Sequence, residues 1–248
     1  MAAKRWWMIW CVGLWMGAAA SCGAPQTVPA AHEGEGTSKP AKAPGEAAEV
    51  SREASGAPDD PTAPLKRAEQ PQHGIEALVI HPIFERRFTT NEHHDGQLGS
   101  LGDALGSDCI IHEIVDEDGR LWLRAYKGDG ARNEDWYGWR QAVLAPVSGQ
   151  VLKINVNPTV NEPGSFTPGV ASYIILKRDD GVHVLLAHIR EPVVAVGDVV
   201  EAGQKVALVG NNGNSRHPHI HIGAWKDKTP LQLRFDLTAL GRLRQTHP

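Results

Sequence analysis

The chain has 248 residues, a formal net charge of −4 and a hydrophobic fraction of 41%. This length suits one sizeable domain with extensions, and the slightly acidic balance offers no basic patch of the kind that binds nucleic acid, so no nucleic-acid partner is expected. The three cysteines, Cys11, Cys22 and Cys109, are too few for the disulfide framework of a small secreted scaffold.

Residues 1–21 have the pattern of a signal peptide. Lys4 and Arg5 give a positive start, and the apolar stretch that follows is shorter than the ~20 residues that span a membrane. The sequence Ala-Ala-Ser-Cys, which ends at Cys22, resembles the cleavage box of bacterial lipoproteins and implies an acylated Cys22 that anchors the exported chain to a membrane. Ordinary secretion, with Cys22 incidental, is the alternative. We therefore expect the protein on the periplasmic side of the cell envelope, or outside the cell if Cys22 is not acylated.

The segment 22–74 continues from this cysteine with Ala, Pro, Gly, Glu, Lys and Ser as its main residues and with no Phe, Trp or Tyr. Such a composition cannot bury enough apolar surface to offset the loss of chain entropy on folding. We predict a disordered linker there. A helix or a partner-binding segment is the alternative.

Residues 75–130 are predicted to form an N-terminal extension of short strands. Residues 75–80 have strand character, and residues 109–126 have the pattern of a β-hairpin. Within it, Cys109 is expected to be a small buried residue, with a redox or catalytic thiol as the alternative. The main domain is expected to follow at 131–248.

Farther along, the alternating residues 182–188 predict a strand that ends at His188, and residues 194–210 predict short strands joined by tight turns.

Residues 215–223 follow and carry histidines at alternate positions. Because side chains in a strand alternate between faces, His219 and His221 point the same way. Two imidazoles side by side on a strand suit a metal ligand next to a proton-transfer group. A solvated face of an edge strand is the alternative.

Residues 187–221 have the sequence AHIREPVVAVGDVVEAGQKVALVGNNGNSRHPHIH. It resembles the catalytic core of the lysostaphin-type, LytM-like zinc endopeptidases, which cut peptide cross-bridges in bacterial cell walls. The sequence VLAPVSGQVLKI, at residues 143–154, resembles a strand pair of the same family, and the resemblance covers roughly residues 131–236. It implies a mostly β fold, with a LytM-like or barrel-sandwich-hybrid-like antiparallel sheet and groove-forming loops. It also implies hydrolysis of peptide bonds in peptidoglycan stem peptides or cross-bridges.

The resemblance assigns roles to the three conspicuous histidines. It implies that His221 binds Zn²⁺, and that His188 and His219 are catalytic residues that move protons or stabilise the reaction intermediate. Because all three are present, we predict an enzyme. A catalytically inactive LytM-like lipoprotein that binds the cell wall or regulates another hydrolase is the alternative. A biotinyl or lipoyl carrier domain shares the glycine turns but needs a lysine at a hairpin tip, and residues 211–214 contain none.

The two remaining metal ligands are harder to assign. Asp135 lies at nearly the family's distance before the Ala-Pro strand, and we predict it as a ligand; a turn or cap aspartate is the alternative. The family's first histidine is missing just before it. His94 is predicted to complete the site, with His93 or His112 as alternatives, and if none serves, the site is degenerate. His217 has no counterpart in the family and is expected at the surface.

Overall fold

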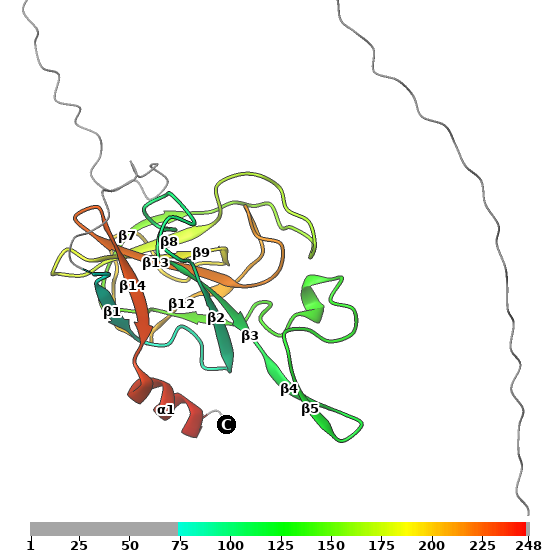
Figure 1. Cartoon of the computed structure of the whole chain (residues 1–248). Coiled ribbons are helices and arrows are strands. Elements are labelled where there is room, and N and C mark those ends of the chain that lie inside the picture. The colour runs from blue at the N-terminus through cyan, green and yellow to red at the C-terminus, as the bar shows by residue number, and fades with distance from the viewer. Residues whose placement is uncertain (1–73, 247–248) are drawn as a thin grey trace, which may run out of the picture. The chain divides into compact units, whose positions relative to one another are not determined.

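The computed structural model describes residues 74–246, so the predicted signal peptide, the lipidation site Cys22 and nearly all of the predicted linker lie outside the described residues. The described chain forms fourteen strands, a short 3-10 helix η1 (Asn133–Asp135) and a C-terminal helix α1 (Leu237–Thr246) (Figure 1). The strands are β1 (Ala77–Ile80), β2 (Phe88–Glu92), β3 (Ser107–Ile111), β4 (Glu113–Glu117), β5 (Arg120–Arg124), β6 (Ala142–Leu144), β7 (Gly149–Asn155), β8 (Tyr173–Lys177), β9 (His183–Ala187), β10 (Ile189–Arg190), β11 (Val199–Val200), β12 (Lys205–Val209), β13 (Ile220–Lys226) and β14 (Thr229–Phe235). The predicted mostly β fold is confirmed.

Nine of the strands make one large sheet. Its order is β1-β14-β13-β9-β8-β7-β11, with β3 paired to β13 and β2 paired to β3. All neighbours run antiparallel except β1 and β14, which are parallel. Although β2 and β3 precede the predicted boundary at residue 130, they are strands of the same sheet as β13 and β14.

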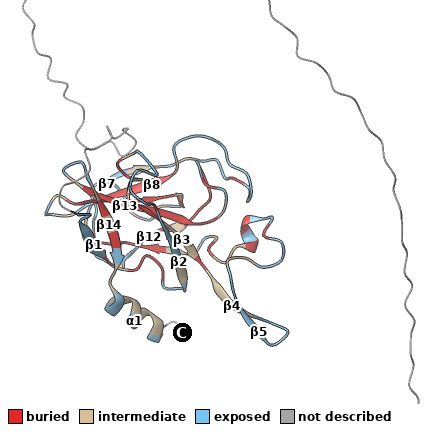
Figure 2. Ribbon diagram, viewed as in Figure 1, coloured by how far each residue is buried: buried red, intermediate tan, exposed pale blue. Residues whose placement is uncertain are grey.

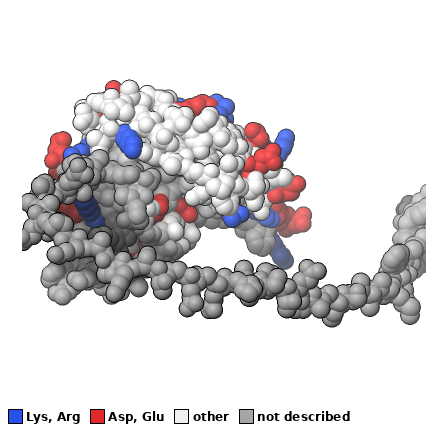
Figure 3. Space-filling model, turned by 90° about the horizontal axis from the view of Figure 1, so that it is seen from above, with Lys and Arg blue, Asp and Glu red and all other residues white. Residues whose placement is uncertain are grey.

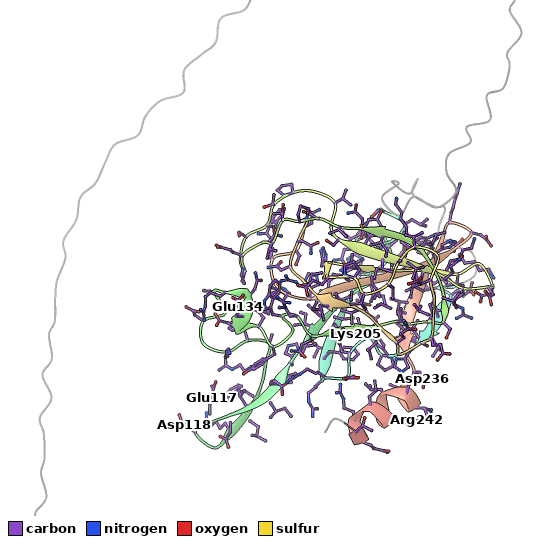
Figure 4. All side chains as sticks on the ribbon, turned by 180° about the vertical axis from the view of Figure 1, so that it is seen from behind. Glu117, Asp118, Glu134, Lys205, Asp236 and Arg242 are labelled. Atoms are coloured by element: carbon purple, nitrogen blue, oxygen red, sulfur yellow. The ribbon has the colours of Figure 1, made fainter. Side chains whose placement is uncertain are left out.

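The remaining strands form a three-stranded sheet, β10-β12-β6, and a separate hairpin, β4-β5. The predicted hairpin is confirmed for β4 and β5, whose turn holds Asp118 and Gly119 at φ 55° and 75°, as a two-residue Asp-Gly turn requires. It projects from the body of the protein, with Glu117 and Asp118 at its tip (Figures 1 and 4). The prediction that the hairpin begins at Cys109 is wrong, because residues 107–111 form β3 and pair with β2 and β13.

Apolar side chains cover both faces of the central strands. β9 is buried at every position and β8 at all but its last, and β8 and β13 lie within the buried interior (Figure 2). The main core lies on one face of these strands, and a smaller cluster consists of Leu101, Tyr173, Ile175, Leu185, Ala187 and Trp225. Burying each large aliphatic side chain contributes about 1.5–3 kcal/mol to the stability of the fold.

Cys109 is fully buried in the main core, as expected. Burial, and after it the charge of Asp108, raises the pKa of its thiol.

The described chain ends in α1. The carboxylate of Asp236 accepts hydrogen bonds from two backbone amides of the first turn at 2.8 and 3.1 Å and so caps the helix (Figure 4). Within residues 74–246, no helix combines the length and the apolar character needed to cross a membrane. On the face seen in Figure 3, most charged side chains lie near the margins, where acidic and basic groups are neighbours.

Candidate active site

Neighbouring strands of the large sheet bring an aspartate and four histidines together. Asp108 in β3 lies opposite His221 in β13, and His221 lies opposite the last residue of β9, so that His188 follows directly beside it. His93 comes directly after β2, and its backbone amide extends the β2–β3 pairing with a hydrogen bond of 2.8 Å. His219 directly precedes β13. The sheet register therefore determines which side chains meet.

The side chains of His93, Asp108 and His221 form a group whose ligand atoms all lie within 4.8 Å of one another. Nδ1 of His221 is 3.0 Å from Oδ1 of Asp108, and Nε2 of His93 is 3.4 Å from Oδ2 of the same carboxylate. Two imidazoles and a carboxylate are a ligand set of catalytic zinc sites, in which ligand atoms at tetrahedral positions lie about 3.4 Å apart. The group therefore fits a divalent metal ion.

Of the three predicted ligands, only His221 belongs to this group within the described part of the chain. His94 is exposed, and its Nδ1 lies 3.0 Å from the carbonyl oxygen of the next residue. Asp135 ends η1 and accepts hydrogen bonds from the backbone amide and the guanidinium group of Arg132, each at 3.1 Å. Its contacts are those of the cap aspartate that was the alternative interpretation. His93 and Asp108 are the residues that the structure groups with His221 instead.

The group contains His93 instead of His94 and Asp108 instead of Asp135. Both differences follow from the pairing of β2 with β3. A loop separates His93 from Asp108, whereas the predicted histidine and aspartate were expected only a few residues apart. Strand parity distinguishes the adjacent histidines: Asn91 lies opposite Asp108, so His93, two residues farther on, points to the same face and His94 to the other. His112, the other alternative, directs Nδ1 at a backbone carbonyl oxygen 2.8 Å away and lies outside the group.

Each of the four site imidazoles directs one ring nitrogen at a backbone carbonyl oxygen. The distances are 3.4 Å for Nδ1 of His93, 2.8 Å for Nδ1 of His188, 2.8 Å for Nδ1 of His219 and 3.1 Å for Nε2 of His221. A carbonyl oxygen only accepts, so that nitrogen carries the proton, and the other nitrogen keeps a lone pair when the ring is neutral. The second ring nitrogens of His93 and His221 face Asp108. Nε2 of His219 lies 3.6 Å from the same carboxylate.

Burial and close contact shift the pKa values of these groups in different directions. Burial, followed by the charges of the neighbouring histidines, lowers the pKa of His188 to about 3, so this ring is neutral at neutral pH. Burial also lowers the pKa of His221, but its interactions with Asp103 and Asp108 outweigh burial and raise it to about 9. Burial raises the pKa of Asp108, yet hydrogen bonds from His219 and His221 hold it well below its usual range.

Buried asparagines fix the turn that leads into β13. Nδ2 of Asn161 donates to two backbone carbonyl oxygens of this turn, both at 2.8 Å, and Nδ2 of Asn211 donates to Oδ1 of Asn133 at 2.9 Å. The side chain of Asn212 donates to a carbonyl oxygen of β10 at 2.8 Å, which holds in place the backbone carbonyl that His188 contacts. Leaving such a buried amide unpaired costs about 1–3 kcal/mol, so the turn presents the histidines in one arrangement.

An aromatic row extends the site away from the metal-binding group. The ring of His217 stacks on Trp136 with a centroid distance of 4.6 Å and lies 4.9 Å from the ring of His219. Trp136 in turn packs against Tyr126 at 4.9 Å. His217 is therefore half-buried rather than a surface residue, and burial lowers its pKa.

Residues 137–233 match peptidase family M23. Two curated relatives, both described as uncharacterized metalloproteases, are each 29% identical to this chain. The relative from Buchnera aphidicola subsp. Baizongia pistaciae matches over 83 residues, which are 34% of this chain and 22% of the relative. The relative from Haemophilus influenzae matches over 79 residues, which are 32% of this chain and 15% of the relative. The chain thus spans less than a quarter of either curated relative.

The fold also resembles solved structures at low sequence identity. The catalytic domain of the prophage-encoded M23 protein EnpA from Enterococcus faecalis is 20% identical, with a TM-score of 0.39 over 59% of this chain and 86% of that one. The catalytic domain of the antimicrobial peptidase lysostaphin from Staphylococcus simulans is 20% identical, with a TM-score of 0.37 over 62% of this chain and 92% of that one.

The segment that matches the family contains some, but not all, of the residues at the candidate site. The matched segment contains His188, His219 and His221 but begins after His93 and Asp108, which the fold brings beside it. Both relatives are described as metalloproteases, and the group of two imidazoles and one carboxylate suits a metal ion. The segment 137–233 is thus similar to peptidase family M23, and the fold places a group of side chains that suits a metal ion beside it.

Proposed function

We propose that the protein is an exported zinc endopeptidase that hydrolyses peptide bonds in peptidoglycan stem peptides or cross-bridges. The observation that carries the proposal is the convergence of His93, Asp108 and His221, with His188 and His219 beside them. We assign the first three as zinc ligands. Three protein ligands leave one tetrahedral position open, as in other hydrolytic zinc sites.

When bound, zinc supplies a Lewis acid that polarises the scissile carbonyl and lowers the pKa of a coordinated water. The chain's own contribution is proton transfer. His219 accepts a proton from the attacking water at Nε2 and later donates it to the leaving amine. The carbonyl oxygen of His217 fixes the ring through Nδ1, at 2.8 Å. His188 packs on His219 with a centroid distance of 4.7 Å, and its lowered pKa keeps it neutral beside that ring.

Peptidoglycan is the proposed substrate because residues 143–154 and 187–221 resemble the lysostaphin-type enzymes. The predicted leader 1–21 and an acylated Cys22 would place the domain in the cell envelope, with the lipid anchor as its membrane attachment. The linker would then let the domain reach the wall.

The alternative function is that of a catalytically inactive relative. The argument for it was that the family's first histidine is missing just before Asp135. In the fold, Nε2 of His93 lies 3.4 Å from Asp108, which supplies an imidazole in that position. This observation favours the enzyme over a protein that only binds the wall.

Digestion of purified peptidoglycan sacculi tests the proposed activity. Protein loaded with Zn²⁺ should release peptides with new amino termini, which mass spectrometry identifies together with the bond that is cut. A chelator should abolish the release, and added Zn²⁺ should restore it. Stoichiometric zinc in the protein combined with intact wall peptides would overturn the proposal.

Zinc binding is expected to release a proton from His221. The pKa of about 9 means that this imidazole is protonated at neutral pH in the metal-free protein, although Nδ1 must be unprotonated to bind a metal. We therefore expect about one proton to be released per zinc ion at neutral pH and none well above pH 9, with affinity rising as pH approaches 9. Calorimetry in buffers of different ionisation enthalpy measures the number released. Equal proton release on both sides of pH 9 would contradict this assignment.

A further inference from the structure

Residues 93–106 join β2 to β3 (Figure 1). This loop brings a second carboxylate, that of Asp103, to His221. Oδ1 of Asp103 lies 3.2 Å from Nε2 of His221, while Asp108 lies 3.0 Å from Nδ1 on the other side of the ring. The side chain of His221 is only 6% exposed, whereas that of Asp103 is 42% exposed. The two carboxylates therefore occupy different sides of one buried imidazole.

The contact with Asp103 determines which ring nitrogen of His221 keeps its proton when the ring is neutral. An ionised carboxylate only accepts hydrogen bonds, so Nε2 keeps its proton toward Asp103 when the ring becomes neutral, and Nδ1 then presents its lone pair to a metal ion. A carboxylate bound to the distal nitrogen also makes the imidazole more basic, and thus a stronger metal ligand. The carbonyl oxygen of Gly102, at 3.1 Å, is a second acceptor for the same proton, but it carries no full charge.

The surrounding loop is packed in a way that holds Asp103 in place. Leu101 is buried in the smaller apolar cluster, and the hydroxyl of Ser100 donates to the Asp103 carboxylate. The loop also approaches β13 closely, because a Cβ atom on Gly223 would collide with the carbonyl oxygen of Gly102. The contact is therefore part of an ordered loop that rests directly on the strand bearing His221.

We propose that Asp103 is a positioning residue for the metal ligand His221. It holds the proton on Nε2, orients the ring so that Nδ1 faces the metal, and raises the affinity of the site for zinc without binding the ion. The inference rests on the proposed function only in that His221 binds zinc; it does not depend on which bond is cut.

Competition with a chromophoric chelator, with Zn²⁺ as the ligand, tests the inference on the full chain. The D103A variant is expected to bind zinc about 10–100-fold more weakly than the native protein, which is the usual cost of removing such a partner. D103N keeps an oxygen acceptor but loses the charge, so its affinity should lie between the two. D95A, which removes an exposed carboxylate of the same loop, is the matched control and should bind zinc like the native protein.

Three results would overturn the inference. Native affinity in D103A would mean that Gly102 alone holds the Nε2 proton. A loss in D103A that is matched by D95A, or accompanied by a lower unfolding temperature of the metal-free protein, would mean that the substitution acts through general disruption of the loop. Absence of zinc binding in the native chain would overturn this inference and the proposed function together, whereas zinc binding without peptide cleavage would contradict only the proposed function.

Discussion

Replacing Asp108 with alanine is expected to abolish zinc binding and peptidase activity together. Its carboxylate contacts both His93 and His221, at 3.4 and 3.0 Å, so the D108A variant lacks the group that joins the two imidazoles. Because a ligand rather than a supporting partner is lost, zinc affinity should fall by more than about 100-fold. Metal analysis of the purified variant and chelator competition measure the loss.

The sequence-predicted ligands provide the matched control. Asp135 is also a buried aspartate, but its carboxylate is bound to Arg132, and His94 is exposed beside His93. The double variant with His94→Ala and Asp135→Ala should therefore keep native zinc affinity. If this double variant loses zinc while D108A keeps it, the assignment of ligands is reversed.

Replacing His219 with alanine is expected to reduce kcat while zinc stays bound. The side chain is buried next to the metal-binding group, with Nε2 3.6 Å from Asp108, but it is not one of the three proposed ligands. Loss of a general base lowers the rate by about 10²–10⁴-fold. Steady-state kinetics on a soluble wall peptide, with zinc content measured on the same sample, separate catalysis from metal binding.

His112 is the control for this experiment, because its imidazole binds a backbone carbonyl oxygen outside the site. The H112A variant should keep both kcat and zinc. If H219A loses zinc in proportion to its activity, His219 acts on the metal rather than on the proton, and the proposed mechanism is incorrect.

Much of the fold follows from patterns along the chain. The alternation in residues 182–188 predicts β9, and the Asp118-Gly119 pair, with positive φ at both residues, fixes the hairpin of β4 and β5. The parallel pairing of β1 with β14 could not be predicted in this way, because it joins opposite ends of the described chain and no local signal specifies it. Local patterns thus identify strands better than they identify the partners of those strands.

Because local patterns do not identify strand partners, only part of the candidate metal site could be predicted from the sequence. His188, His219 and His221 lie within one conspicuous stretch, so their proximity could be inferred from strand alternation and family resemblance. Asp108 lies near the start of an inconspicuous strand, and only its register opposite His221 places it beside the histidines. The prediction of Asp135 depends on distance along the chain, which carries less information than sheet register when a long loop separates His93 from Asp108.

A crystal structure of the zinc-loaded protein, with anomalous data collected at the zinc absorption edge, would identify the atoms that bind the metal. We expect one strong peak bonded to Nε2 of His93, a carboxylate oxygen of Asp108 and Nδ1 of His221, at about 2.0–2.2 Å from each. A peak bonded to Asp135 or His94, or zinc bound only at the surface of an active enzyme, would contradict it.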